Sequence, residues 1–143
     1  MGYTHQYTQL MIGLGVSSIN DTWGGFAQNV KKVEDYLQLF NTYEMPIFKG
    51  HILNEEDLLM RKHILNLMCK NETSWDKLDL QNHNFKSSLS CLHDLEKDGL
   101  IEKIENGIKV TKLGERFLRN ICAAFDTILH QKQIDKNVFS TAD

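Results

Sequence analysis

The sequence lacks residues and segments that are typical of several classes of protein. It contains one proline, three cysteines and no serine- or proline-rich tract that would indicate a linker. No apolar run approaches the roughly 18 residues of a membrane span, and the N-terminus lacks the basic and apolar segments of a signal peptide. We therefore expect a cytoplasmic protein with no membrane partner.

Cationic side chains are also scarce. Lysine and arginine number 16 against 19 acidic residues, which gives a net charge of -3 at pH 7. Nucleic-acid-binding proteins usually present a basic face, so we expect no nucleic-acid partner. With 41% hydrophobic and 24% charged residues, the 143-residue chain has the composition of a globular protein with an apolar core.

The three cysteines are widely spaced, and each has apolar neighbours. Cys69, Cys91 and Cys122 suit neither a disulfide framework nor a zinc site, and we interpret them as buried thiols. The six histidines include no pair at ligand spacing. We therefore expect no metal site made by this chain alone.

Apolar residues recur at helical spacing in several segments of the chain. Helices are predicted over residues 29–40, 54–69, 84–97 and 111–130, with a loop at 20–28 and a connector at 41–52. Asn54 is a favourable N-cap, and Gly99 is a favourable C-terminal cap. Asn106 and Gly107 lie between two apolar runs, which predicts a β-hairpin over residues 101–110.

The stretch LMIGLGVSSI, residues 10–19, predicts a strand buried on both faces. Such strands belong to parallel sheets, and the rest of the chain does not supply one. Gly15, Ser17 and Ile19 lie at the end of this strand. Because glycine allows a ligand to approach the backbone, the strand end is either a ligand contact or a plain tight end.

A short helical turn is predicted near residues 75–80. From residue 54 the order is therefore helix, short helix, helix, hairpin, helix, which is typical of a winged helix. We expect a mainly α fold, in which a winged-helix-like C-terminal domain carries a small β-hairpin and a separate strand lies near the N-terminus. The third predicted helix and the hairpin carry mixed charges rather than clustered cations. This pattern favours a packing module over a DNA-binding one.

Three arginines form a candidate binding patch. Arg61 lies in the second predicted helix, and Arg116 and Arg119 lie at i and i+3 in the last one. Such residues are often solvated or ion-paired. The alternative is a cationic patch for a carboxylate-rich ligand, because arginine binds carboxylates through two hydrogen bonds.

Six stretches together carry a resemblance to a known family. They are GYT (2–4), IGLGVSSI (12–19), FAQN (26–29), the helix with Glu56-Asp57 and Arg61 that ends in LMC (67–69), DGL (98–100) and GIKVTKLGERFLRNICAAFDTIL (107–129). In this order and at this spacing, the chain resembles the C-terminal part of the oxygen-independent coproporphyrinogen III oxidases (coproporphyrinogen dehydrogenases), which are radical SAM enzymes.

The resemblance implies an activity in haem biosynthesis. These oxidoreductases convert two propionates of coproporphyrinogen III to vinyl groups and give protoporphyrinogen IX. They use a [4Fe-4S] cluster and S-adenosylmethionine (SAM), which is cleaved to a 5′-deoxyadenosyl radical. By resemblance Ile19 contacts SAM, with Gly15 and Ser17 as weaker candidates. The anionic substrate motivates the hypothesis that the three arginines face propionates.

The chain departs from the family in lacking the cluster motif Cys-x3-Cys-x2-Cys and the SAM-binding glycines of the early barrel strands. We therefore expect one piece of such an enzyme. Residues 1–28 would be the last strand and loop of a truncated α/β barrel, 29–53 a helix and connector, and 54–143 the winged-helix-like domain. This piece would cover the active site, bind no cofactor and catalyse nothing alone, and its partner would be the parent's own radical SAM barrel.

Two other interpretations remain open. The related radical SAM haem chaperone shares the barrel but usually has Gly-Ala-His-Ser where this chain has Gly-Val-Ser-Ser. A free-standing winged-helix interaction module would have nothing before Met1. The long match over residues 107–129 favours the oxidase.

Overall fold

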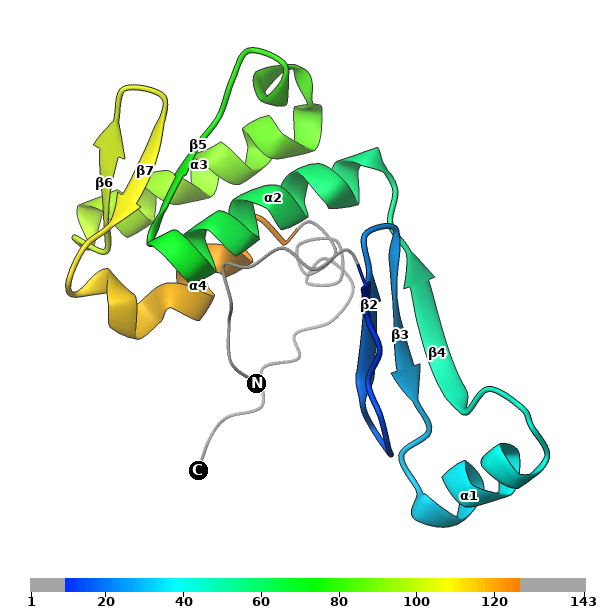
Figure 1. Ribbon diagram of the computed structural model, residues 1–143. Coiled ribbons are helices and arrows are strands. Elements are labelled where there is room, and N and C mark those ends of the chain that lie inside the picture. Colours follow the sequence, from blue (N-terminus) through cyan, green and yellow to red (C-terminus); the bar gives the residue numbers. More distant parts are fainter. Residues whose placement is uncertain (1–9, 127–143) are drawn as a thin grey trace. The chain divides into compact units, whose positions relative to one another are not determined.

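The computed structural model describes residues 10–126, which form two compact units (Figure 1). We call residues 10–58 the sheet unit and residues 59–126 the helical unit. The boundary falls inside one helix, between Leu58 and Leu59. Each unit has its own sheet.

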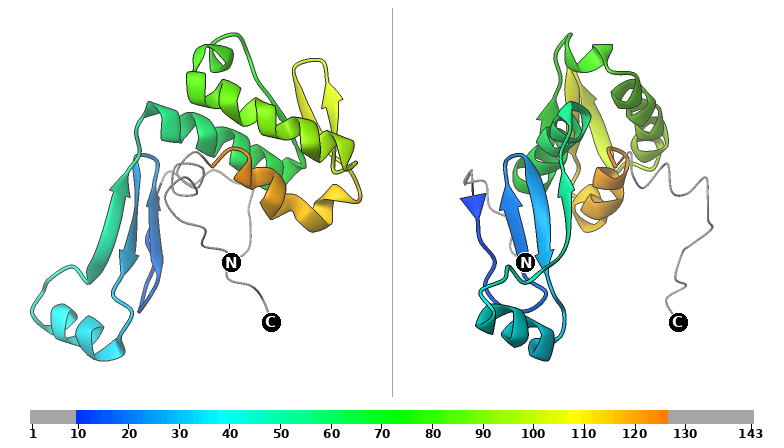
Figure 2. Two further views of the ribbon diagram at one scale, coloured as in Figure 1. Left: turned by 180° about the vertical axis from the view of Figure 1, so that it is seen from behind. Right: turned by 90° about the vertical axis from the view of Figure 1, so that its right-hand side faces the viewer.

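The sheet unit is a four-stranded antiparallel sheet with one helix. In chain order it contains β1 (Leu10–Met11), β2 (Ile19–Thr22), β3 (Gly25–Asn29), α1 (Val33–Asn41) and β4 (Ile47–Ile52). The strands are ordered β1-β2-β3-β4, and each pairs with its neighbour in antiparallel fashion. Both views of Figure 2 show α1 beyond the end of the sheet, in the connection from β3 to β4.

The prediction of one buried strand over residues 10–19 was wrong. Only its two ends are in strands, where Leu10 pairs with Thr22 and Ile19 pairs with Gln28. Between them Ile12 and Leu14 are exposed, with Leu14 85% accessible, and Val16 is half-buried. The segment therefore pairs within its own chain, in an antiparallel sheet, and is not a strand without partners. Its glycines allow a turn where the apolar pattern suggested a continuous strand.

The predicted loop at 20–28 and connector at 41–52 were also wrong. They contain most of β2, most of β3 and all of β4, and a two-residue turn at Trp23 and Gly24 joins β2 to β3. The segment GFAQN has glycine and asparagine at its ends, and both are depleted in strands. Main-chain pairing within the sheet therefore overrides local propensity here.

The helical unit contains most of the predicted helices. Its elements are α2 (Glu55–Lys70, which begins in the sheet unit), β5 (Glu72–Ser74), η1 (Asp79–Gln81), α3 (His83–Lys97), β6 (Ile101–Ile104), β7 (Gly107–Val110), η2 (Gly114–Phe117) and α4 (Leu118–Ala123). The hairpin of β6 and β7 is confirmed, and β5, which was not predicted, extends it to a sheet of order β5-β7-β6. Asn54 caps α2 by accepting a 2.8 Å hydrogen bond from the Asp57 N–H, and Gly99 follows α3 with φ +71°.

The last predicted helix, 111–130, is interrupted. A 3-10 segment, η2, precedes α4, and its last residue, Phe117, has φ -113° and ψ 22°. The predicted helical positions Ile128 and Leu129 lie outside the described residues. The winged-helix assignment stays a prediction. Over residues 10–126, no helix has the length and apolar character needed to cross a membrane.

An apolar core holds the helical unit together. Its buried members are Met60, Leu67, Phe85, Leu92, Ile101, Ile108, Val110, Ile121, Cys122, Ala124 and Phe125. They come from α2, α3, α4, the hairpin and the residues after α4. Burial of this many large side chains, at about 1.5–3 kcal/mol each, makes packing the main stabilising term of the unit.

One histidine is buried in this core. The His63 ring is 0% exposed and lies 4.6 Å from the Phe85 ring and 5.8 Å from the Phe125 ring, measured between centroids. Its Nδ1 is 2.8 Å from the Thr73 hydroxyl, and its Nε2 is 3.6 Å from a carboxylate oxygen of Asp79. Burial lowers the pKa of His63 from 6.5 to about 4, although the carboxylate opposes the shift. The ring is therefore neutral at pH 7.

Because His63 is buried in its neutral form, we predict that the folded chain loses stability in acid. Between pH 6.5 and about 4, the unfolded chain binds a proton at His63 more readily than the folded chain. The free energy of unfolding should therefore fall by up to about 2 kcal/mol between about pH 7.5 and about pH 5. Urea denaturation of the chain at the two pH values measures this loss.

Two variants separate this effect from other titrations. His63→Gln should remove most of the loss, whereas His93→Gln, at an exposed position on α3, should leave it unchanged. A folded His63→Gln chain with the same pH dependence as the unmodified chain would contradict the assignment.

Candidate functional site

The structure brings the three predicted SAM-contact residues together around one turn. Gly15 and Ser17 lie in the segment between β1 and β2, residues 12–18, which we call the glycine loop, and Ile19 begins β2. Gly15 has φ +90° and Ser17 has φ 58°, so the loop turns through the left-handed region twice. The Ser17 N–H donates to the Val30 carbonyl at 2.9 Å, which ties the end of the loop to the chain after β3.

Two asparagines hold the glycine loop. The Asn29 side-chain amide donates to the carbonyl oxygens of Gly15 at 2.9 Å and Gly13 at 3.1 Å. The Asn20 amide donates to Asn29 Oδ1 at 2.9 Å, and Asn20 Oδ1 accepts from the Gly13 N–H at 3.0 Å. The Tyr36 hydroxyl of α1 accepts from the Gly15 N–H at 3.2 Å. The main chain of the loop is therefore fixed from two sides.

Ile19 presents an apolar side chain beside this loop. It is 37% exposed and lies opposite Gln28 in the sheet. Because side chains alternate along a strand, Ile19 and Asn20 point to opposite faces. Apart from Gly15 itself and its two chain neighbours, no atom of the described residues lies within 4 Å of the position that a Cβ at Gly15 would occupy. The site thus offers open space beside Gly15 and an apolar surface at Ile19, and we assign no acid or base to it.

Sequence reasoning missed the residues that build this site. Asn20 fell in the segment predicted to be a loop, 20–28, whereas Asn29 and Tyr36 fell in the segment predicted to be a helix, 29–40. A buried asparagine leaves no trace in an apolar pattern, because the same residue type is common in exposed turns. The signal that was present is the stretch FAQN, which contributed to the resemblance.

The three candidate arginines all lie in the helical unit. Arg61 is half-buried on α2, whereas Arg116 in η2 and Arg119 in α4 are exposed. The expectation that Arg116 and Arg119 share one continuous helix was wrong, because the helix changes type between them. Their spacing therefore does not establish a common face.

The cysteines do not form a metal centre in the described part of the chain. Burial raises the pKa of the Cys122 thiol to about 11, which keeps it protonated, whereas metal ligands are thiolates. Cys69 on α2 and Cys91 on α3 are half-buried, and none of the three is in a disulfide. Over residues 10–126 no three His, Cys, Asp or Glu side chains are placed to hold a metal ion.

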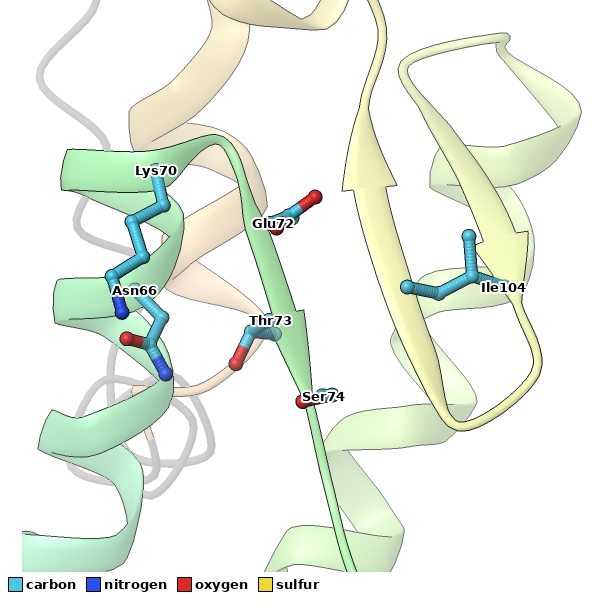
Figure 3. A pocket seen from close by; sticks show the side chains of 6 residues that line it. All are labelled: Asn66, Lys70, Glu72, Thr73, Ser74 and Ile104. Carbon is cyan, nitrogen blue, oxygen red and sulfur yellow. The ribbon is translucent and has the colours of Figure 1, made fainter.

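A small hollow lies in the helical unit (Figure 3). Its volume is about 180 Å³, and it is lined by Asn66, Lys70, Glu72, Thr73, Ser74 and Ile104. Ligand pockets usually measure about 300 Å³ or more. The hydroxyl of Thr73 is also engaged with His63 in the core. We therefore do not assign a ligand to this hollow.

The chain is similar to named enzymes over nearly its whole length. It is 35% identical over 150 residues to the oxygen-independent coproporphyrinogen III oxidase of Synechocystis sp., which covers 99% of this chain and 32% of the relative. It is 36% identical over 138 residues to the enzyme of the same name from Escherichia coli, covering 92% of this chain and 30% of the relative. No protein-family model matches the chain.

A solved structure shows the same similarity. Coproporphyrinogen III oxidase (HemN) from Escherichia coli, described as a radical SAM enzyme, matches with a TM-score of 0.78 and 34% identity, over 90% of this chain and 31% of that one. The resemblance stated from the sequence is therefore confirmed. The chain spans about a third of the length of these relatives.

The close packing of the glycine loop around Gly13 can be tested by substitution. A Cβ at this position would lie 2.6 Å from the Ile19 carbonyl oxygen and 2.7 Å from the Ser18 Cβ. Gly13→Ala should therefore displace the loop and speed amide hydrogen exchange over residues 13–19 about tenfold, because such crowding costs about 1–3 kcal/mol. Mass spectrometry of exchanged peptides measures this change.

The control is Gly24→Ala in the turn between β2 and β3. Within residues 10–126, and leaving aside its two chain neighbours, no other residue has an atom within 4 Å of the corresponding Cβ position at Gly24. Exchange should therefore stay close to that of the unmodified chain. Equal exchange in the two variants would refute the close packing of the loop.

Proposed function

We propose that this chain is the part of a radical SAM coproporphyrinogen III oxidase that covers the active site, and that it catalyses nothing without a radical SAM barrel. The observation that carries the proposal is the similarity to the oxidases along nearly the whole chain, in sequence and in fold. The parent enzyme would decarboxylate two propionates of coproporphyrinogen III to vinyl groups, giving protoporphyrinogen IX.

The surface of the sheet unit supports a role inside a larger protein. Most large apolar side chains of this unit are exposed: Leu10, Met11, Ile12, Leu14, Ile19, Trp23, Phe26, Val33, Leu37, Phe40, Tyr43, Met45, Ile47, Phe48 and Ile52. They come from all four strands, the glycine loop, α1 and the connections. Extensive apolar exposure marks a surface that another protein part covers. In the parent enzyme, we expect the rest of the chain to cover it.

The two cofactors of the parent fit this chain unequally. The iron–sulfur cluster does not fit, since the buried Cys122 thiol stays protonated and the required motif is missing from the sequence. Residues outside this chain would hold it. SAM fits the glycine loop, where the space beside Gly15 is open and Ile19 offers an apolar contact. When bound, SAM would supply the radical chemistry of the reaction.

A chimera tests this proposal. Residues 1–143 would replace the matching segment of the Escherichia coli enzyme, and the purified chimera would be loaded with its cluster. It should bind SAM and convert coproporphyrinogen III to protoporphyrinogen IX. Chromatography of the porphyrins, after their oxidation, measures this conversion. The isolated chain should neither cleave SAM nor consume the porphyrinogen.

One specific result with the chimera would contradict the proposal. A chimera that folds, holds its cluster and cleaves SAM but leaves coproporphyrinogen III unchanged would refute it. The Escherichia coli enzyme with the segment deleted shows what the barrel does without any C-terminal part.

The arginines carry a second prediction. If Arg61, Arg116 and Arg119 bind propionates, then alanine at each position should raise the KM of the chimera for coproporphyrinogen III about tenfold or more. This follows because a hydrogen bond to a charged group contributes about 1.5–3 kcal/mol. Steady-state kinetics measure the change, and Lys86→Ala on the exposed surface of α3 is the charge-matched control. If an arginine variant keeps the KM of the unmodified chimera, that residue does not bind substrate.

A further inference from the structure

We propose that Asn29 is a positioning residue for the glycine loop and thereby sets the affinity of that loop for SAM. The proposal rests on the proposed function, because the loop is a SAM contact only in the complete enzyme. Asn29 itself would not touch SAM. It would act through the main chain of residues 13–18.

The burial of Asn29 is unusual for its surroundings. Among residues 10–58, the part of the sheet unit that the structure describes, it is the one buried residue, with 5% of its surface accessible. Apolar side chains of the same unit remain exposed. A carboxamide withdrawn from water is unfavourable unless it is hydrogen-bonded, so its partners determine whether this arrangement is stable.

The side chain and main chain of Asn29 bind the loop at separate points. Both N–H groups of the side chain are used, one by the Gly13 carbonyl and one by the Gly15 carbonyl. The main-chain N–H of Asn29 donates to the Ser18 carbonyl at 2.9 Å. One residue thus fixes the beginning, the middle and the end of the glycine loop.

Asn20 completes the arrangement from the neighbouring strand. Its amide donates to Asn29 Oδ1 and to the Ala27 carbonyl at 3.3 Å, and its Oδ1 accepts from the Gly13 N–H. Ala27 lies opposite Asn20 in the sheet, and Asn29 is two residues further along the same strand. Strand alternation therefore places both asparagines on one face of the sheet, where their side chains meet.

These bonds form the loop before any ligand arrives. A preformed loop does not lose conformational freedom when SAM binds, and this raises affinity. If the asparagine bonds are removed, the same loop has to become ordered on binding. The expected consequence is weaker SAM binding with little effect on a substrate that binds elsewhere.

The decisive variant is Asn29→Asp, which keeps the size of the side chain. It replaces the two N–H donors by a carboxylate oxygen that faces two carbonyl oxygens. In the isolated chain, amide exchange over residues 13–18 should become about tenfold faster. In the chimera, the Kd for SAM, measured by equilibrium dialysis, should rise about tenfold, while the Kd for coproporphyrinogen III changes less than about twofold.

The control makes the same chemical change at an exposed position. Asn41→Asp at the end of α1 should leave both dissociation constants and the exchange rates unchanged. An Asn29→Asp chimera that binds SAM as tightly as the unmodified chimera would overturn the proposal. If Asn29→Asp does not fold, Asn20→Asp takes its place, since it removes the donor to Asn29 Oδ1 and keeps the acceptor for Gly13. That variant should weaken SAM binding severalfold, and unchanged binding would again overturn the proposal.

The two proposals can fail separately. If the unmodified chimera binds no SAM, the proposed function is rejected. Hydrogen exchange in the isolated chain still measures whether Asn29 holds the loop. If SAM binds and the asparagine variants bind it equally well, only the positioning role is rejected.

Discussion

The burial of apolar side chains is the interaction on which this chain depends, and it is satisfied in only one of the two units. In the helical unit, α2, α3, α4 and the hairpin enclose a core in which Phe85, Phe125 and Leu67 are fully buried. The sheet unit has exposed apolar side chains on its strands and helix instead. A sheet held mainly by main-chain pairing is marginal by itself, so its stability in a complete protein would come from what covers it.

Polar groups take over the role of a core where the sheet unit needs definite geometry. Asn29 and Asn20 connect two strands to the glycine loop through side-chain amides, and the two glycines leave room for that loop to turn. Such a network is specific because every donor and acceptor in it has a particular partner. The network connects the strands of the sheet to the glycine loop, which the resemblance relates to SAM binding.

The sequence predicted the helical unit far better than the sheet unit, for a physical reason. Helices α2 and α3 have caps and an apolar period, and the hairpin has a turn signal. These features can be recognised from the local sequence. Strands β2 to β4 lack such features, because β4 is exposed throughout and the least exposed positions of β2 and β3 are mainly small or polar residues, so the strands carry no apolar alternation. The continuous apolar run at 10–19 gave the opposite error, since high apolar content was interpreted as burial. The role of Gly15, Ser17 and Ile19 as SAM contacts stays a prediction, and the asparagines that hold the glycine loop needed three-dimensional information.

The central proposal is that this chain works as one part of a larger radical SAM enzyme. The most direct measurement is the DNA sequence immediately upstream of the codon for Met1. Our account predicts that the reading frame continues upstream and encodes a barrel with the motif Cys-x3-Cys-x2-Cys. An in-frame stop codon just before Met1, with no radical SAM coding sequence beside it, would contradict the account.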